Sequence, residues 1–366
     1  MDARLTPEQT ELQRAARQLA RDLAPTTVVD LEDTTRAKRL AVAVADAGWL
    51  ELRSDAGDGA PLAGGVEAAI VADALGGAVA DVAFTGPVLA ADLARRADVS
   101  TSTPAVVAFA PSLAEVATVA GRATTTPVCA VDDRNIDAVF VLTADDRPRL
   151  ATVALDGATP AAPGGTDLTR SVRVIPAGVS VQPADGRTLT PDDLTAWRAL
   201  GLALTSADLV GIMRGVLDVT VAYATERRQF GVPVGSFQAV QHLVAEAHCF
   251  MEGSRSVAVH ASWAVDNLPA DEALAAGRVA KAYCVRAART VCETAIQVHG
   301  GIGNTWECLA HVYLRRSLLS TQWFGDDGAQ LHALETERLG VTGAIPVRSE
   351  RLLDELAHGE RASGAI

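Results

Sequence analysis

Ala224 to His242 reads ATERRQFGVPVGSFQAVQH and separates two long stretches of helical periodicity. Arg227 and Arg228 come at the expected C-terminus of the first helix, where cations complement the helix dipole. A second interruption, Gln297 to Glu307, reads QVHGGIGNTWE, and its glycines leave backbone amides accessible at a helix junction. Each segment alone is compatible with an ordinary helix end, so their joint occurrence is the informative feature.

Long helices are predicted on both sides of these segments. The first begins at Thr190-Pro191, with acidic residues in its first turn, and runs to about Thr225. Two more are expected over 237–265 and 271–299, and shorter helices over 306–322 and 329–339. Antiparallel helices of this length joined by short loops form a bundle. We therefore predict a C-terminal helix bundle over 189–366.

The preceding residues predict two further domains. Residues 1–100 are expected to form an α-helical N-terminal domain, with helices over 7–23, 33–47, 66–75 and 87–97. Residues 101–188 carry short Val, Ala and Thr runs separated by Pro, Gly and Asp. This spacing predicts a small antiparallel β-sandwich or barrel as the middle domain.

Composition excludes several classes of protein. The chain has a net charge of −13 and is 49% hydrophobic, which argues against nucleic acid, anionic membranes and disorder. We predict neither a signal peptide nor a membrane span, because aspartates interrupt the most apolar stretches, 68–84 and 199–213. The five cysteines lack metal-ligand spacing and are read as reduced thiols. These features favour a cytoplasmic protein without a metal.

The two interrupting segments, in this order and on bundle helices, resemble the acyl-CoA dehydrogenase family. The GIGNTWECLAHVYLRR form is similar to a bacterial branch often associated with bulky acyl-CoA substrates such as steroid side chains. The family's motif positions are matched here by Tyr223, Ala224, Arg227, Gln229, Phe230 and Gly231, then Phe237, Gln238 and Gln241, and finally Gln297, Gly300, Gly301 and Gly303.

The resemblance implies FAD-dependent α,β-dehydrogenation of an acyl-CoA thioester. In such enzymes a carboxylate removes the α-proton while hydride leaves the β-carbon for the flavin. The flavin is shared across a subunit interface, and the two segments hold the dinucleotide end of the neighbour's flavin. The residues that the resemblance assigns to FAD are Arg227, Gln229, Phe230, Phe237, Gln238, Gln297, Gly300 and Gly301.

The chain departs from the family where the catalytic base is expected. The usual Glu position is Phe324, and the position used by a minority of members is about Gly201. No catalytic residue is therefore predicted. The family's Thr-Glu-Pro-x-x-Gly-Ser-Asp segment, which contacts flavin and substrate, also has no match between Thr101 and Thr188. The nearest stretch is TTTPVCAVDD.

These departures affect one half of the flavin site and leave the other half intact. The leading hypothesis is a subunit that completes the flavin site of a related subunit, in a heterotetramer with two copies of each. The alternatives are a self-sufficient dehydrogenase with a displaced acid, a flavin monooxygenase of the same fold, and a non-enzymatic scaffold. Asp208, Asp326 and Asp327 are the candidate acids, with surface or capping roles as their ordinary interpretation.

Three further interpretations concern packing. Gly201 and Gly211 are read as making room for a wide substrate on the first bundle helix. Trp306 and His311 are read as bundle packing. His299, inside the glycine loop, is read either as a phosphate contact or as a packed loop histidine.

Overall fold

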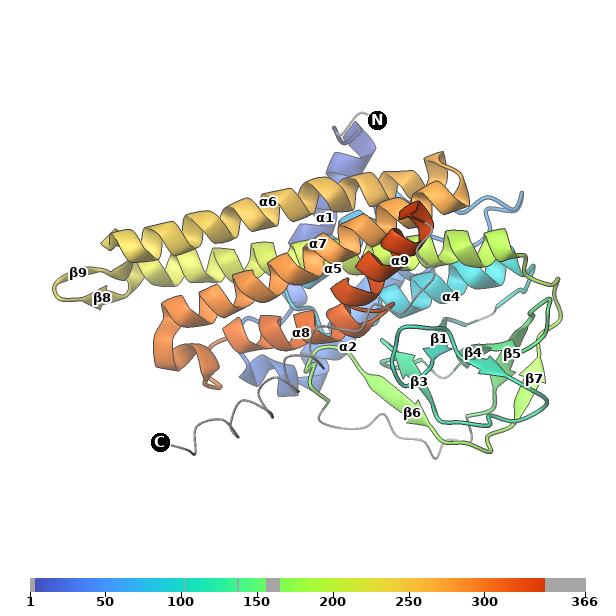
Figure 1. Ribbon diagram of the computed structural model, residues 1–366. Helices are drawn as coiled ribbons and strands as arrows, with labels where there is room; N and C mark the ends of the chain where they lie inside the picture. Colours follow the sequence, from blue (N-terminus) through green and yellow to red (C-terminus); the bar gives the residue numbers. More distant parts are fainter. Residues whose placement is uncertain (1–3, 102, 137, 156–164, 340–366) are drawn as a thin grey trace, which may run out of the picture. The chain divides into compact units, whose positions relative to one another are not determined.

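The computed structural model describes residues 4–101, 103–136, 138–155 and 165–339, and its elements follow the order helices, strands, helices (Figure 1). The N-terminal helices are α1 (Pro7–Leu23), α2 (Thr34–Asp46), α3 (Gly65–Gly77) and α4 (Thr85–Arg96), with short 3-10 turns η1 (Val29–Glu32) and η2 (Trp49–Glu51). The start of α1 is a capping box, in which the Gln9 backbone amide donates to Thr6 Oγ1 at 3.2 Å. The predicted α-helical N-terminal region is confirmed.

The middle region is one sheet built from short strands, of which β1, β3, β4 and β5 are largely buried. Its strands are β1 (Ala105–Phe109), β2 (Thr118–Val119), β3 (Val128–Val131), β4 (Ala138–Thr143), β5 (Leu150–Val153), β6 (Val172–Ile175) and β7 (Val181–Pro183). Their order is β6-β3-β1-β4-β5-β7, with β2 beside β4. The prediction of an antiparallel sheet is wrong in one respect, because β4 pairs in parallel with β1 and with β2. The chain forms β3 between β1 and β4, a connection long enough for a parallel crossover.

Three long helices form the core of the C-terminal bundle and lie side by side in Figure 1. They are α5 (Pro191–Glu226), α6 (Gln238–Asn267) and α7 (Ala270–His299), followed by η4 (Gly300–Asn304), α8 (Ala310–Gln322) and α9 (Asp327–Leu339). A two-stranded hairpin, β8 (Arg228–Gln229) and β9 (Val232–Pro233), and the turn η3 (Val234–Ser236) connect α5 to α6. The predicted helices are therefore present, with ends shifted by a few residues.

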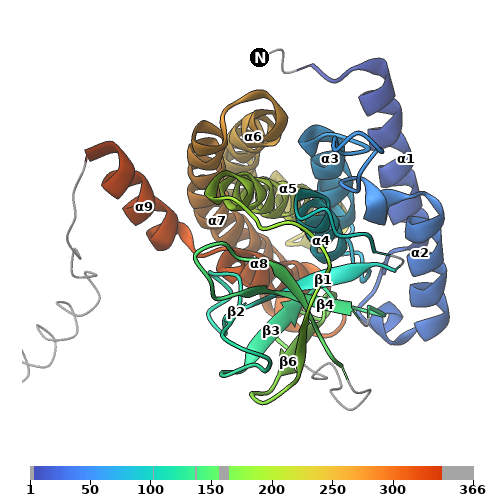
Figure 2. The ribbon, with the colours of Figure 1, turned by 90° about the vertical axis from the view of Figure 1, so that its right-hand side faces the viewer.

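Glycines allow α3 and α5 to pack closely. A Cβ at Gly211 would lie 2.1 Å from the Asp73 carbonyl oxygen, and one at Gly215 would lie 2.0 Å from the Gly77 carbonyl oxygen. The reading of Gly211 as room for a substrate is therefore wrong, because the space holds the backbone of α3. Figure 2, a view along the bundle, shows α5 between α3 and α6.

One hydrophobic core runs through the N-terminal helices, the sheet and α5. The described chain up to Leu331 forms one compact unit, so the boundaries 1–100, 101–188 and 189–366 remain predictions.

Among the described helices, α5 alone is long and apolar enough to cross a membrane, but 94% of its most apolar window is buried inside the structure. This burial is typical of a core helix.

Candidate functional site

The two positions at which the resemblance places a catalytic base lie in contact. Gly201 lies within α5, and Phe324 lies in the turn between α8 and α9. A Cβ at Gly201 would lie only 2.2 Å from Phe324 Cζ, so the phenyl ring occupies the space that a side chain at 201 would need. The reading of Gly201 as room for a substrate is therefore wrong.

The backbone at Phe324 is held in an unfavourable conformation by hydrogen bonds. Its φ is +68°, which is uncommon for a residue with a bulky side chain. Its amide donates to the Leu113 carbonyl at 2.9 Å, and its carbonyl accepts from Gln330 Nε2 at 2.7 Å. Leu113 follows β1, in a segment that sequence reasoning did not connect with the base position.

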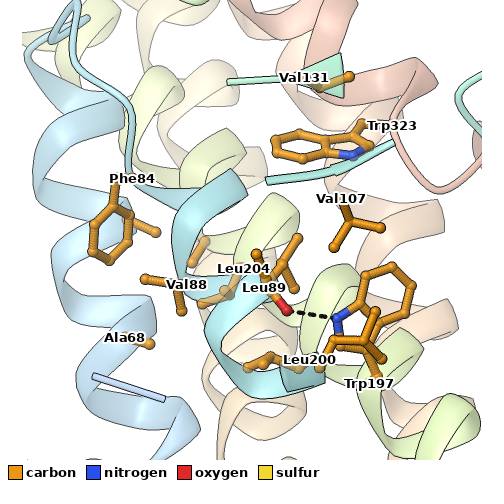
Figure 3. Close-up of a cluster of buried hydrophobic side chains, with 14 of the residues drawn as sticks. Ala68, Phe84, Val88, Leu89, Val107, Val131, Trp197, Leu200, Leu204 and Trp323 are labelled. Atoms are coloured by element: carbon orange, nitrogen blue, oxygen red, sulfur yellow. Dashed lines mark hydrogen bonds between the residues drawn. The ribbon is translucent and has the colours of Figure 1, made fainter. Parts of the chain in front are cut away.

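An aromatic cluster surrounds Phe324. Its ring centroid lies 5.1 Å from Phe109, 5.4 Å from Trp197 and 6.1 Å from Trp323. Only 4% of the chain is aromatic, yet these four buried side chains come from β1, α5 and the α8–α9 turn. Figure 3 shows Trp197 and Trp323 near Val107, with Trp197 Nε1 donating to the Leu89 carbonyl at 2.8 Å. We name Phe109, Trp197, Trp323 and Phe324 the aromatic plug.

The candidate replacement acids have other partners. Asp208 is buried, which corrects the surface or capping interpretation. It accepts from Arg316 Nη2 at 2.7 Å and from Ser320 Oγ at 2.6 Å. Although burial opposes its charged form, the guanidinium groups of Arg316 and Arg170 hold the pKa of Asp208 below its ordinary value.

The remaining acids near the plug are also bound locally. Asp326 caps α9 by accepting from the Ala329 amide at 2.9 Å, and Asp327 pairs with Arg286 at 2.8 Å. A capping or surface role is therefore confirmed for both. The sequence analysis missed Glu115, which shares a cavity of about 310 Å³ with Trp197 and Phe324. Its carboxylate is exposed and paired with Arg198 at 2.6 Å.

The residues expected to contact FAD lie in two exposed loops or at the helix ends beside them. Arg227 ends α5, and its exposed side chain has no ion pair within the described part of the chain. The hairpin that follows turns at Phe230 and Gly231, whose φ values are +52° and +84°, as in a type I′ turn. Phe230 is 94% exposed and makes an edge contact with Phe237 at 6.3 Å. Gln229 and Gln238 are exposed beside them.

The glycine loop is also open to solvent. Gln297, Gly300 and Gly301 are exposed, and no atom lies within 4 Å of a Cβ built at either glycine. Gly300 has a φ of +65°, which favours glycine. The backbone here is therefore open to the close approach of another group.

Tyr223 and His299 join the two loops at one end of the bundle. Their rings stack at 4.4 Å, and Tyr223 Oη donates to the His299 carbonyl at 3.4 Å. His299 is buried, with Nδ1 2.8 Å from the Ala295 carbonyl, which favours the packed-histidine interpretation. We name the exposed surface formed by the two loops the loop face. It consists of Arg227, Gln229, Phe230, Phe237, Gln238, Gln297, Gly300 and Gly301.

Packing predictions near the loop face had mixed outcomes. His311 is buried, as expected, but Trp306 is 62% exposed. The guanidinium of Arg315 lies 5.8 Å from the Trp306 ring. All five cysteines are free, and no cluster of metal-ligating side chains occurs among the described residues.

Comparison with known proteins defines the class of fold. The solved structure of a steroid ACAD, Tcur3481-Tcur3483, superposes with a TM-score of 0.74 at 24% identity, covering 89% of this chain and 96% of that one. The ChsE4-ChsE5 complex from Mycobacterium tuberculosis superposes with a TM-score of 0.72 at 22% identity, covering 94% of this chain and all of that one. These likenesses show the acyl-CoA dehydrogenase fold, which confirms the predicted fold class.

Sequence comparison adds a similarity in the C-terminal part of the chain. Residues 200–337 match the family model described as the acyl-CoA dehydrogenase C-terminal domain. The acyl-CoA dehydrogenase FadE34 of Mycobacterium tuberculosis is 33% identical over 239 residues, which cover 53% of this chain. The match covers only 34% of FadE34. Residues 200–337 are therefore similar to the C-terminal domain of acyl-CoA dehydrogenases, and the chain spans less than half the length of the curated relatives it matches first.

Proposed function

We propose that this chain is the subunit of an FAD-dependent acyl-CoA dehydrogenase that lacks a catalytic base and completes the flavin site of a related subunit. The observation that carries the proposal is the contact between Phe324 and Gly201. Neither residue accepts a proton, and the aromatic plug around them is buried. A dehydrogenase base needs a titratable group within reach of the substrate's α-carbon.

The loop face supports the second half of the proposal. Arg227 offers an exposed cation suited to a pyrophosphate, and Gly300 and Gly301 leave the backbone open to close approach. These residues fit the dinucleotide end of FAD, and bound FAD would supply the hydride acceptor. The exposed Phe230 would contact the subunit that owns the flavin.

Relatives support the proposed partner and substrate. Two similar folds, the steroid ACAD Tcur3481-Tcur3483 and the ChsE4-ChsE5 complex, are each named for two different polypeptides. We propose the same kind of assembly here, a heterotetramer with two copies of each subunit. The name of the first also supports a bulky, steroid-derived acyl-CoA as substrate. Within this assembly, the present chain would provide positioning contacts and the partner would provide the base.

The test is co-expression with a related subunit that has an intact glutamate. We expect the purified complex to hold half as many flavins as subunits and to oxidise an acyl-CoA. This chain alone should bind little FAD and show no activity. Arg227→Gln should lower the flavin content of the complex, whereas Arg228→Gln, whose exposed side chain contacts the Gly231 carbonyl, should not. Full flavin occupancy with turnover by the isolated chain would contradict the proposal.

A further inference from the structure

A cavity of about 530 Å³ lies apart from both the aromatic plug and the loop face. Helices α1 and α3 line one side of it, α6 lines the other, and α5 forms its floor. We name it the α3–α6 cavity. Its volume and mostly apolar lining are those of small-molecule sites. The apolar side chains include Val66, Ile70, Val210, Met251 and Val259.

The packing of α3 explains why the cavity exists. At its N-terminus, α3 touches α6, because a Cβ at Gly65 would lie 2.7 Å from the Ser262 carbonyl oxygen. Towards its C-terminus, α3 packs against α5 instead, through the close contacts of Asp73 and Gly77 with Gly211 and Gly215. From these contacts we infer a wedge-shaped cavity that is narrow near Ser262, where α3 and α6 meet, and wider towards Asp73. Figure 2 shows the backbone of α5 between α3 and α6.

Cations gather at the wide end of the wedge. Arg17 and Arg214 both approach Asp73 Oδ2, at 3.4 and 3.0 Å, so two guanidinium groups share one carboxylate. Arg255 also lines the cavity and pairs with Glu252 at 2.6 Å. The lining therefore carries three arginines against two acids, an excess of one positive charge.

The hydrogen bonding of these arginines is incomplete. The Nε atoms of Arg17 and Arg214 are buried and have no hydrogen-bond partner in the described part of the chain. Both side chains are nevertheless partly exposed, 35% for Arg17 and 24% for Arg214, so their accessible nitrogens can meet a bound anion. The cavity thus combines an apolar wedge with a cationic mouth that has unused donors.

We propose that the α3–α6 cavity binds an organic carboxylate with an apolar body. The body lies between α3 and α6, and the carboxylate meets Arg17 and Arg214 at the wide end. The single excess positive charge favours a monoanion. This site is independent of the flavin arrangement under Proposed function, because none of its lining residues belongs to the loop face or to the plug.

The experiment is calorimetric titration of decanoate, with decanol as the neutral analogue, into the full chain together with any subunit that copurifies. We expect decanoate to bind and decanol to bind at least about tenfold more weakly. Arg214→Gln should weaken decanoate binding by a similar factor. The matched control is Arg289→Gln, which removes an exposed arginine paired with Glu293 on α7 and should leave binding unchanged.

A second variant tests the apolar part of the site. Val259→Phe places a ring in the wedge and should abolish decanoate binding while the melting temperature stays close to that of the unaltered chain. If Arg214→Gln unfolds the chain, Arg17→Gln is tested in its place, because Arg17 is the more exposed of the two arginines. The proposal is overturned by an absence of binding at millimolar decanoate, by equal affinity for decanol, or by unchanged affinity in the arginine or Val259 variant.

Discussion

The Phe324 ring occupies the space next to the Cα of Gly201, where a Cβ would meet Cζ at 2.2 Å. The two residues are complementary, because one supplies a large ring and the other has no side chain. The ring therefore fills the space beside the Gly201 backbone, as in a close-packed protein interior. A buried carboxylate introduced among Trp197, Trp323 and Phe109 would lack a charged partner in the plug.

The first prediction concerns this contact. Gly201→Ala should destabilise the chain by about 1–2 kcal/mol, because the cost of overpacking exceeds the gain of about 1 kcal/mol from replacing a helical glycine. Chemical denaturation followed by circular dichroism measures the change. In a Phe324→Leu background the same substitution should become neutral or stabilising. An increase in stability for Gly201→Ala in the unaltered chain would show that the ring moves aside freely.

The second prediction is that Phe230 contributes to association with the partner subunit and not to the stability of this chain. Phe230 is 94% exposed, so Phe230→Ser should change the free energy of unfolding by less than about 0.5 kcal/mol. The same variant should weaken association with the partner subunit, measured by sedimentation. Val29→Ser, at a 70% exposed position outside the loop face, is the control and should affect neither quantity. Unchanged association of the Phe230 variant would show that this side chain is not part of the interface.

Sequence patterns predicted the helices well because their signals are local. The capping residues Thr6 and Thr190 and the long apolar periodicities specify helix starts and faces within a few residues. The parallel pairing of β1 with β4 was missed, because strand pairing depends on distant segments.

In the candidate site, too, the sequence predicted the features encoded by local motifs and missed the contacts between distant segments. The loop-face residues were found because they occur in two continuous motifs, although their role in FAD binding remains a proposal. Sequence spacing gave no sign that Leu113 would bond to Phe324 or that Asp208 would pair with Arg316. Both contacts join segments more than a hundred residues apart, so local patterns carry no signal for them.

The third prediction tests Asp208 as a structural group. Asp208→Asn leaves Arg316 without its buried carboxylate and leaves Arg170 with Asp167 alone, and it should cost about 3–5 kcal/mol of stability. Since the folded-state pKa of Asp208 lies below its ordinary value, its contribution is complete above about pH 4 and is lost as the pH falls further. Denaturation from neutral to acidic pH measures both effects.

Asp327→Asn is the matched control for Asp208. Asp327 pairs with an exposed arginine, so its loss should cost at most about 1 kcal/mol. Full stability of Asp208→Asn, combined with loss of dehydrogenase activity, would instead support a self-sufficient enzyme that uses Asp208 as its base.

The fourth prediction concerns Lys281, which is fully buried and donates to the carbonyls of Ser320 and Trp323. Burial lowers its pKa from 10.5 to about 7, and the nearby positive charge of Arg170 acts in the same direction. Between these two values the unfolded chain binds more protons than the folded chain. The contribution of Lys281 should therefore become more favourable as the pH rises, by at most about 1.4 kcal/mol per pH unit.

Comparison with Lys281→Met isolates this effect, because all other titrating groups cancel in the difference. The lost hydrogen bonds add a penalty that does not depend on pH. The stability of the unaltered chain relative to the variant should rise steadily from pH 7 to about pH 9. Lys38, the other lysine of the chain, is exposed on α2, so Lys38→Met should show no such trend. A constant difference for Lys281→Met across this range would mean that Lys281 stays charged in the folded protein.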